Sequence, residues 1–309
     1  MTIDPAAILR DAPRAAQFFD GFEEVTVEGP AGPVFARVGG EGPPLVLLHG
    51  YPQTSAMWHR VAPVLARTYR VICPDLRGYG RSAKPPTDAC HGPYTKRAMA
   101  GDVLCLMDHL GHDRFLLGAH DRGGRVAHRL AADAPERVRA LSVLDIAPTR
   151  EMYAEGGPAF AAAYWHWFWL TQPAPLPERL IGADPDWFWC RKCCSGGAGA
   201  GPFVRQALEE YLDAFRDPAS IHGSCEDYRA AWTTDIAHDD AEVAKLPMPL
   251  LALWGRAGAI EAHFDCLALW RRRAMDVRGH ALEGGHYLAE ECPEEVLADW
   301  LPFFAAAPA

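Results

Sequence analysis

The stretch from Phe115 to Arg129 constrains the fold of this chain more than any other. It begins with a short apolar run, Phe115–Ala119, which is typical of a buried strand. Small residues lie two positions before and two positions after Asp121, and a helix-like segment follows directly. Strand, tight turn and helix in this order are the context of a nucleophile elbow, a sharp bend that raises one side chain above a parallel sheet. We therefore expect Asp121 to be that side chain.

A carboxylate at the elbow indicates displacement at saturated carbon followed by hydrolysis. Because the reference pKa of Asp is about 3.9, the side chain is ionised at neutral pH and can attack an alkyl carbon directly. The product is an ester of Asp121 that water can open, whereas a serine at this place would give an inert ether. The alternative is that Asp121 is a buried structural residue of a strand–helix turn.

The alternation of strand and helix patterns along the chain predicts an α/β fold. Glu23–Glu28 and Val34–Val38 predict an antiparallel hairpin at a sheet edge. Strands that alternate with helices predict a mostly parallel sheet with helices on both faces. The further predicted strands are Pro44–His49, Tyr69–Cys73, Phe115–Ala119, Arg139–Asp145, Pro249–Trp254 and Val277–Leu282. The predicted helices include Trp58–Ala66, Lys96–Leu110 and Pro293–Phe304.

The strand rhythm stops between the strand that follows the elbow and the strand at Pro249. This part is rich in Trp, Tyr, Phe and Pro and has helix-like pieces. We predict a core domain of residues 1–147 and 238–309 and an inserted helical cap domain of residues 148–237. The cap contains Cys190, Cys193 and Cys194, but no second cluster at zinc-like spacing accompanies them. We interpret them as structural thiols.

Charge and cysteine content limit the partners and the compartment. The net charge of −10 argues against nucleic acid or an anionic membrane as a partner. The first residues lack the basic start and apolar core of a signal peptide. Nine cysteines are an odd number, and reduced thiols are the simplest interpretation. We therefore expect a cytoplasmic protein that acts on a small molecule.

A nucleophile at an elbow requires a histidine base and an acid that orients it. His286 lies in a Gly-rich loop after the last predicted strand, where folds of this kind place the base. The acid commonly follows the penultimate strand, but Leu253–Gly258 contains no Asp. We therefore assign the acid to Asp145, at the end of the strand after the elbow. The alternatives are that Asp145 caps its own turn, or that Asp265 or Glu261 is the acid.

With these residues assigned, the chain resembles the fluoroacetate (haloacetate) dehalogenases of the α/β-hydrolase superfamily over nearly its whole length. The resemblance implies an α/β-hydrolase fold with a helical cap inserted after the strand that follows the elbow. The elbow and the His-Gly-x-Pro loop also occur in epoxide hydrolases and haloalkane dehalogenases, whereas Asp-Arg-x-x-Arg together with the cap His-Trp and Tyr does not. The matching runs are Gly118–Arg125, Leu144–Thr149, Tyr164–Phe168, Ile221–Arg229 and Gly284–His286.

The resemblance implies two sets of ligand-binding residues. In that family the equivalents of Arg122 and Arg125 hold the substrate carboxylate, for which the planar guanidinium fork is suited. The equivalents of His166, Trp167 and Tyr228 bind the halide, and each carries an N–H or O–H donor. From the residues alone, the two arginines are equally compatible with an exposed helix face, and the aromatic residues with the core of a cap. We interpret the other cap tyrosines, Tyr153, Tyr164 and Tyr211, as structural.

The run His49-Gly50-Tyr51-Pro52 resembles the oxyanion loop of the superfamily. We expect the backbone N–H groups of Tyr51 and Arg122 to stabilise the tetrahedral intermediate of ester hydrolysis. Because the backbone makes this contact, we expect the side chain of Tyr51 to matter less.

The predicted activity is hydrolysis of a haloacetate such as fluoroacetate or chloroacetate to glycolate and halide. This chemistry requires no metal and no organic cofactor, and the resemblance implies a homodimer. One alternative is an epoxide hydrolase, which uses the same Asp elbow with cap tyrosines that protonate the epoxide oxygen. The other is a catalytically silent receptor for a small molecule.

Overall fold

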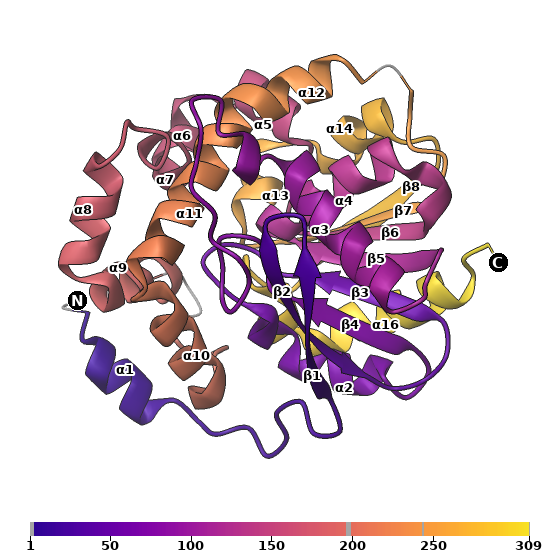
Figure 1. Cartoon of the computed structure of the whole chain (residues 1–309), viewed down its shortest axis with the longest axis horizontal. Helices are drawn as coiled ribbons and strands as arrows, with labels where there is room; N and C mark the ends of the chain where they lie inside the picture. The colour runs from indigo at the N-terminus through magenta and orange to yellow at the C-terminus, as the bar shows by residue number, and fades with distance from the viewer. Residues whose placement is uncertain (1–2, 196–198, 243, 309) are drawn as a thin grey trace.

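An eight-stranded sheet in the order β1-β2-β4-β3-β5-β6-β7-β8 forms the centre of the molecule (Figure 1). The computed structural model describes residues 3–195, 199–242 and 244–308. The strands β3 to β8 run parallel to their neighbours, while the β1–β2 hairpin and the β2–β4 pair are antiparallel. The strands are β1 (Glu23–Gly29), β2 (Gly32–Gly39), β3 (Pro44–Leu48), β4 (Arg70–Pro74), β5 (Phe115–His120), β6 (Val138–Leu144), β7 (Leu250–Gly255) and β8 (Val277–Leu282). The predicted strands and edge hairpin are confirmed, apart from one or two residues at their ends.

Helices cover both faces of this sheet, as predicted (Figure 1). Helices α3 and α4 pack side by side on one face. On the other face α16 packs through Trp300, whose indole Nε1 donates to Ser142 Oγ of β6 at 2.7 Å. The helices outside the insertion are α1 (Pro5–Asp11), α2 (Ala62–Leu65), α3 (Lys96–His109), α4 (Asp121–Asp133), α13 (Ala259–His263), α14 (Cys266–Arg273), α15 (Leu288–Glu291) and α16 (Pro293–Ala305).

The helical stretch predicted around Trp58–Ala66 is confirmed, but it is divided into two elements. The chain instead forms a 3₁₀ helix over Ser55–Arg60 and then the short α2. The backbone N–H of Val61 bonds back only three residues, to Trp58. Because Pro63 has no N–H to continue an α-helical ladder, the two pieces stay separate.

The described part of the insertion between β6 and β7, residues 149–195 and 199–240, consists of helices joined by turns and short loops, with no strand. Its helices α8 to α11 lie together at one side of the sheet, where α1 packs against α9 and α10 (Figure 1). The insertion contains α5 (Thr149–Glu155), α6 (Pro158–Ala163), α7 (Trp165–Trp169), α8 (Leu176–Ala183), α9 (Pro185–Cys193), α10 (Arg205–Phe215), α11 (Pro218–Ala230), a π-helical turn (Ala231–Asp235) and α12 (Ile236–Asp240). The division into separate core and cap domains stays a prediction.

Helix α4 follows the elbow and is buried on both sides. Its sequence has the alternating polar and apolar faces of a surface helix, yet Arg122, Arg125 and Arg129 are all buried. Arg122 bonds to Asp227 of α11 and Arg129 bonds to Asp239 of α12. The polar face of α4 therefore meets the insertion, and this contact forms the floor of the site.

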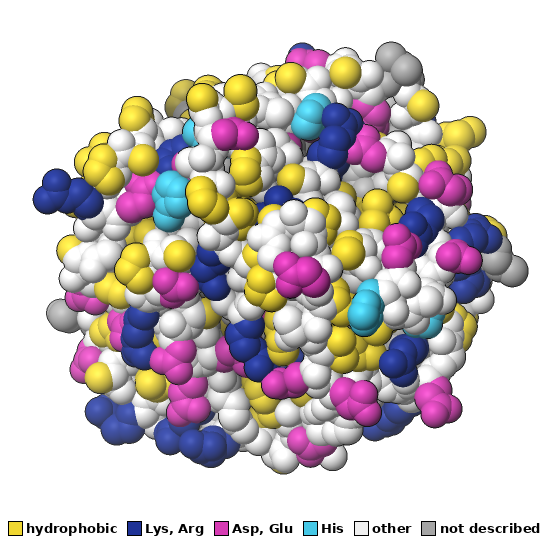
Figure 2. Space-filling view, viewed as in Figure 1, with side chains coloured by type: hydrophobic (Ala, Val, Ile, Leu, Met, Phe, Trp, Pro, Cys, Tyr) yellow, Lys and Arg dark blue, Asp and Glu magenta, His cyan; other side chains and the backbone are white. Residues whose placement is uncertain are grey.

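The surface and the helices give two further observations about partners. On the face in Figure 2, basic and acidic side chains are interspersed, and neither sign forms an extended area. Within the part of the chain that the structure describes, no helix combines the length and apolarity needed to cross a bilayer.

Candidate active site

Asp121 lies at the junction of β5 and α4 in a strained backbone conformation. Its φ of +45° is in the left-handed region, which residues other than glycine rarely adopt. The turn is tight because a Cβ at Gly123 would lie 2.4 Å from the carbonyl oxygen of His49. The strand–turn–helix elbow predicted around Asp121 is confirmed.

The structure brings the predicted base and acid to this elbow. His286 Nδ1 lies 2.6 Å from Asp145 Oδ2, and His286 Nε2 lies 3.9 Å from Asp121 Oδ2. A carboxylate can only accept, so Nδ1 carries the proton of this hydrogen bond and Nε2 is the ring nitrogen that faces Asp121. The second oxygen of Asp145 accepts from the backbone N–H of Gly255 at 2.9 Å. The three side chains thus have the geometry of a nucleophile, a base and an orienting acid.

The alternative acids are engaged away from His286. Asp265 accepts from the backbone N–H of Ala268 at 3.0 Å and caps α14. Glu261 accepts from the indole of Trp254. Of the three candidate acids, Asp145 is therefore the one in hydrogen-bond contact with His286.

The loop after β3 places a backbone donor on the nucleophile. Tyr51 N–H donates to Asp121 Oδ1 at 3.0 Å. The approach is close, because a Cβ at Gly50 would lie 2.5 Å from the Cβ of Asp121. The second predicted donor, the backbone N–H of Arg122, belongs to the first turn of α4, where N–H groups lack helical acceptors. This arrangement suits an oxyanion that forms at the Asp121 carbonyl.

Arg122 and Arg125 are both buried, so they are not exposed helix residues. Arg122 donates from Nε and Nη2 to Asp227, while Arg125 Nη1 donates to Thr149 Oγ1 at 2.9 Å. Each guanidinium keeps one buried nitrogen without a hydrogen-bond partner among the described residues, Nη1 of Arg122 and Nε of Arg125. Buried N–H groups of this kind are costly unless a ligand accepts from them.

The charges of the site favour an anion beside Asp121. Burial, together with the neighbouring charge of Arg122, lowers the pKa of Arg125, so this cation lacks full compensation. Burial alone would raise the pKa of Asp121, but His286, His120 and the two arginines outweigh it and lower the pKa to about 2. Asp121 is therefore ionised at neutral pH, as a nucleophile must be.

Aromatic side chains of the insertion lie over both arginines. The ring of Tyr228 lies 4.2 Å from Arg122 Cζ, and the ring of Trp167 lies 4.5 Å from Arg125 Cζ. The rings of His166 and Tyr228 are 5.9 Å apart. In the described chain, His166 Nδ1, Trp167 Nε1 and Tyr228 Oη are buried and have no hydrogen-bond partner. Burial raises the pKa of Tyr228 well above its usual value, so its hydroxyl stays a neutral donor.

Comparisons with known proteins place this geometry in a family. Residues 43–186 match the model of the alpha/beta hydrolase fold. A fluoroacetate dehalogenase from Burkholderia sp. is 47% identical over 280 residues, which cover 90% of this chain and 92% of that protein. The chain belongs to the haloacetate dehalogenase family of the α/β-hydrolases. It is therefore an enzyme, a hydrolase of the class that acts on carbon–halide bonds.

Two further relatives match this dehalogenase-family chain over most of their own length. A soluble epoxide hydrolase from Corynebacterium sp. is 35% identical over 86% of this chain and 91% of its own. The crystal structure of a putative alpha/beta hydrolase from Nostoc sp. is 48% identical and superposes with a TM-score of 0.91, covering 94% of this chain and all of that one.

Three hydrogen-bonding groups of this dehalogenase-family site were not assigned from the sequence. The hydroxyls of Tyr51 and Tyr153 are buried without a partner in the described residues, although we expected the Tyr51 side chain to matter less and Tyr153 to be structural. The ring of Tyr153 lies 4.8 Å from that of Trp167. The third group is the carboxylate of Asp227. Asp227 directly precedes Tyr228 in a run that matches the family, and this position in the sequence is the signal that could have found it. Tyr211 is structural as interpreted, since its hydroxyl donates to Glu290 at 3.1 Å.

A cavity of about 890 Å³ leads to His286 between the insertion and the core. Tyr164, His166 and Tyr287 are among the side chains that line it, together with Cys193. All nine cysteines are free thiols, including the three of the cap cluster. Of the three, Cys193 borders the cavity, and none of them forms a disulfide.

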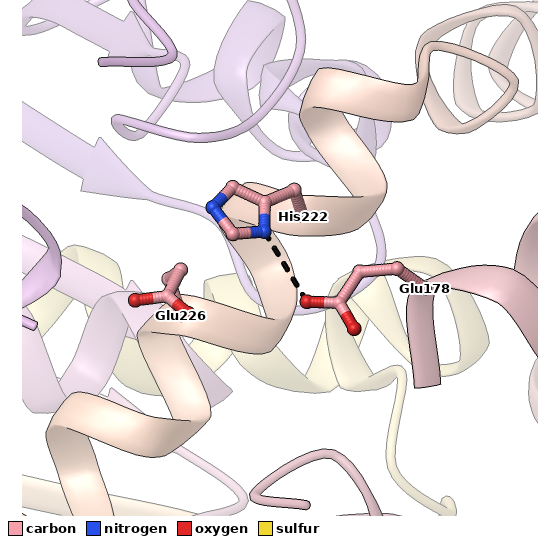
Figure 3. Close-up of side chains that lie close together, drawn as sticks. All are labelled: Glu178, His222 and Glu226. Carbon is pink, nitrogen blue, oxygen red and sulfur yellow. Dashed lines mark hydrogen bonds and ion pairs between the residues drawn. The ribbon is translucent and has the colours of Figure 1, made fainter. Parts of the chain in front are cut away.

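One cluster outside the site has the residue types of a metal centre. Glu178, His222 and Glu226 offer ligand atoms within 4.8 Å of one another. Their side chains are drawn in Figure 3. Arg229 Nη1, however, donates to Glu178 Oε1 and to Glu226 Oε1, both at 2.6 Å. Nδ1 of His91 also lies 2.7 Å from Glu226 Oε2, and Nδ1 of His222 lies 3.2 Å from Glu178 Oε1. The carboxylate oxygens are thus already engaged by side chains, so we interpret the cluster as an ion-pair network rather than a cation site.

Proposed function

We propose that this enzyme hydrolyses haloacetates, fluoroacetate and chloroacetate among them, to glycolate, halide and a proton. The single observation that carries the proposal is the set of unpartnered buried donors beside an elbow aspartate. Two belong to cations, which suit a carboxylate, and three belong to aromatic side chains, which suit a leaving halide. A haloacetate presents both acceptors one carbon apart.

In the first proposed step the substrate carboxylate accepts from Arg122 Nη1 and Arg125 Nε. This places the α-carbon before Asp121, whose Oδ1 is held by the Tyr51 N–H. The free oxygen of Asp121 then attacks the α-carbon, the carbon–halogen bond breaks, and the electron pair leaves with the halide. The leaving ion is received by His166, Trp167 and Tyr228.

In the second step His286 Nε2 removes a proton from water, and the hydroxide attacks the carbonyl carbon of the Asp121 ester. The backbone N–H groups of Tyr51 and Arg122 stabilise the oxyanion. Asp145 stabilises the imidazolium that forms. When the intermediate collapses, the departing glycolate oxygen takes the proton from His286, and the Asp121 carboxyl group that results loses its proton to return to the carboxylate. These steps use no metal and no organic cofactor.

The test is halide release from fluoroacetate and chloroacetate, followed with ion-selective electrodes and with glycolate assayed in parallel. We expect both halides to be released with one glycolate each. Release of chloride alone would keep the mechanism and remove fluoroacetate from the substrates. Release of neither halide would contradict the proposal.

An epoxide hydrolase is the second candidate, because one relative carries that name and because Tyr228 and Tyr51 have unpartnered hydroxyls. The two buried arginines disfavour it, since a neutral epoxide leaves both cations without an acceptor. Hydrolysis of styrene oxide in the absence of haloacetate turnover would favour it. Ligand binding with no turnover of either class would favour a receptor.

The Tyr228→Phe variant tests the halide pocket. We expect a loss of about 10²-fold in kcat for fluoroacetate and a much smaller loss for chloroacetate, because fluoride accepts hydrogen bonds more strongly. The control is Tyr69→Phe, a buried tyrosine packed on Phe304 in the core. Equal losses on the two substrates would show that Tyr228 does not contact the leaving halide.

We also propose a homodimer and a cytoplasmic location. Three exposed apolar side chains of α7 to α9, Trp165, Leu180 and Trp187, provide a surface that a second copy would cover. Light scattering should give twice the 33.9 kDa mass of one chain, and a monomer at micromolar concentration would contradict the dimer. The nine free thiols support a reducing compartment, which cell fractionation tests.

A further inference from the structure

Arg122 is held at its edge by a residue of the cap. Asp227 of α11 accepts from Arg122 Nε at 3.0 Å and from Nη2 at 2.5 Å. The backbone carbonyl of Asp227 also accepts from Nη2, at 2.8 Å. Neither side chain has any exposed surface. The guanidinium fork, which the sequence assigned to the substrate, is therefore occupied by Asp227, and Nη1 is the nitrogen that remains.

Asp227 is itself fully satisfied and ionised. Tyr79 Oη donates to Asp227 Oδ2 at 2.7 Å, and Lys96 Nζ forms an ion pair with Oδ1. Burial alone would raise the pKa of Asp227, but Arg122 and Lys96 hold it well below its usual range. The carboxylate is thus a fixed charge that two core helices and one core loop lock in place.

The flat face of the Arg122 guanidinium lies over the ring of Tyr228, the residue that follows Asp227. Arg122 Cζ is 4.2 Å from the ring centroid of Tyr228. One short segment of α11 therefore holds Arg122 by its edge through Asp227 and by its face through Tyr228. This couples the position of the carboxylate-binding nitrogen to the position of the halide-binding hydroxyl.

We infer that Asp227 is a positioning residue for substrate carboxylate recognition. It acts through Arg122. By fixing the guanidinium, Asp227 points Nη1 at the substrate carboxylate while the Tyr228 hydroxyl points at the halide. The inference rests on the proposed function. Its competitor is a purely structural ion pair between cap and core, which would affect folding but not the recognition of a carboxylate.

Asp227→Asn separates the two explanations. A misaligned Arg122 weakens carboxylate binding, so we expect KM for chloroacetate and Kd for acetate to rise about tenfold or more, with kcat changed less than about threefold. Tryptophan fluorescence follows acetate binding, since Trp167 lies beside Arg125. If the role of Asp227 is purely structural, the substitution lowers the melting temperature and the fraction of active enzyme. The apparent kcat then falls, while KM and Kd stay unchanged, and that result would overturn the inference.

The matched control is Asp235→Asn. Asp235 is also buried and accepts from the backbone N–H of Lys96 at 2.9 Å, with its side chain 3.3 Å from Lys96 Nζ. Its carboxylate forms no hydrogen bond or ion pair with Arg122 in the described structure, so we expect KM within about twofold of wild type.

A double-mutant cycle tests whether Asp227 acts through Arg122. If it does, Asp227→Asn adds little to the KM of an Arg122→Gln variant, whereas independent effects would multiply. Multiplying effects would overturn the inference.

Failure of the proposed function gives a different result. If the wild-type enzyme releases no halide, the acetate titration still decides the role of Asp227. Weaker acetate binding by Asp227→Asn then supports the inference, while equal binding, or no binding by the wild type, overturns it.

Discussion

The Asp121→Asn enzyme should release no halide from fluoroacetate or chloroacetate, a loss of about 10⁴-fold or more in kcat. An amide at this position carries no negative charge and cannot form the alkyl ester. The same substitution removes the anion that compensates Arg122 and Arg125, so the variant should bind acetate at least as tightly as the wild type. Loss of turnover with retained carboxylate binding would identify Asp121 as the nucleophile.

Asp133→Asn is the control for this variant. Asp133 ends the same helix, α4, and pairs with Arg97 at the surface. Halide release by this control should match the wild type. Release by the Asp121→Asn enzyme at more than a trace would refute a covalent role for Asp121 and would indicate direct attack by water.

The His286→Asn enzyme should release halide once per active site and then stop, with steady-state turnover reduced by about 10⁴-fold or more. The first step needs only the ionised Asp121 carboxylate. Loss of His286 removes one of the groups that lower its pKa, but His120, Arg125 and Arg122 remain, so the carboxylate stays charged at neutral pH without help from a base. The second step needs the Nε2 lone pair, which an amide does not supply. Rapid-quench measurement of halide gives the burst, and mass spectrometry of the intact protein should show one added carboxymethyl group.

His280→Asn is the matched control for this histidine. His280 lies on β8, close to His286 in sequence but exposed and paired with Asp299. It should leave the turnover unchanged. Undiminished turnover of the His286 variant would exclude His286 as the base, and the absence of a burst would show that His286 also acts in the first step.

Local patterns predicted the scaffold of the site because the site depends on where strands end. Asp121, Asp145 and His286 each follow a strand that the periodicity identifies, and neighbouring strands of a parallel sheet end at one edge. The three side chains therefore lie close together because the strands before them end at the same edge of the sheet. The roles of the arginines and of the cap donors came from the resemblance to a family and remain proposals.

The sequence by itself determined the strands, the elbow and the order of nucleophile, acid and base, since period-two and period-3.6 patterns report which side of an element is buried. Only the tertiary structure decided what covers α4, which partner holds Arg122 and which of its nitrogens stays free. That partner, Asp227, is 105 residues away in the chain. Periodicity shows that a face is buried but does not name the element that buries it, and pairing across such a separation depends on how the cap packs on the core.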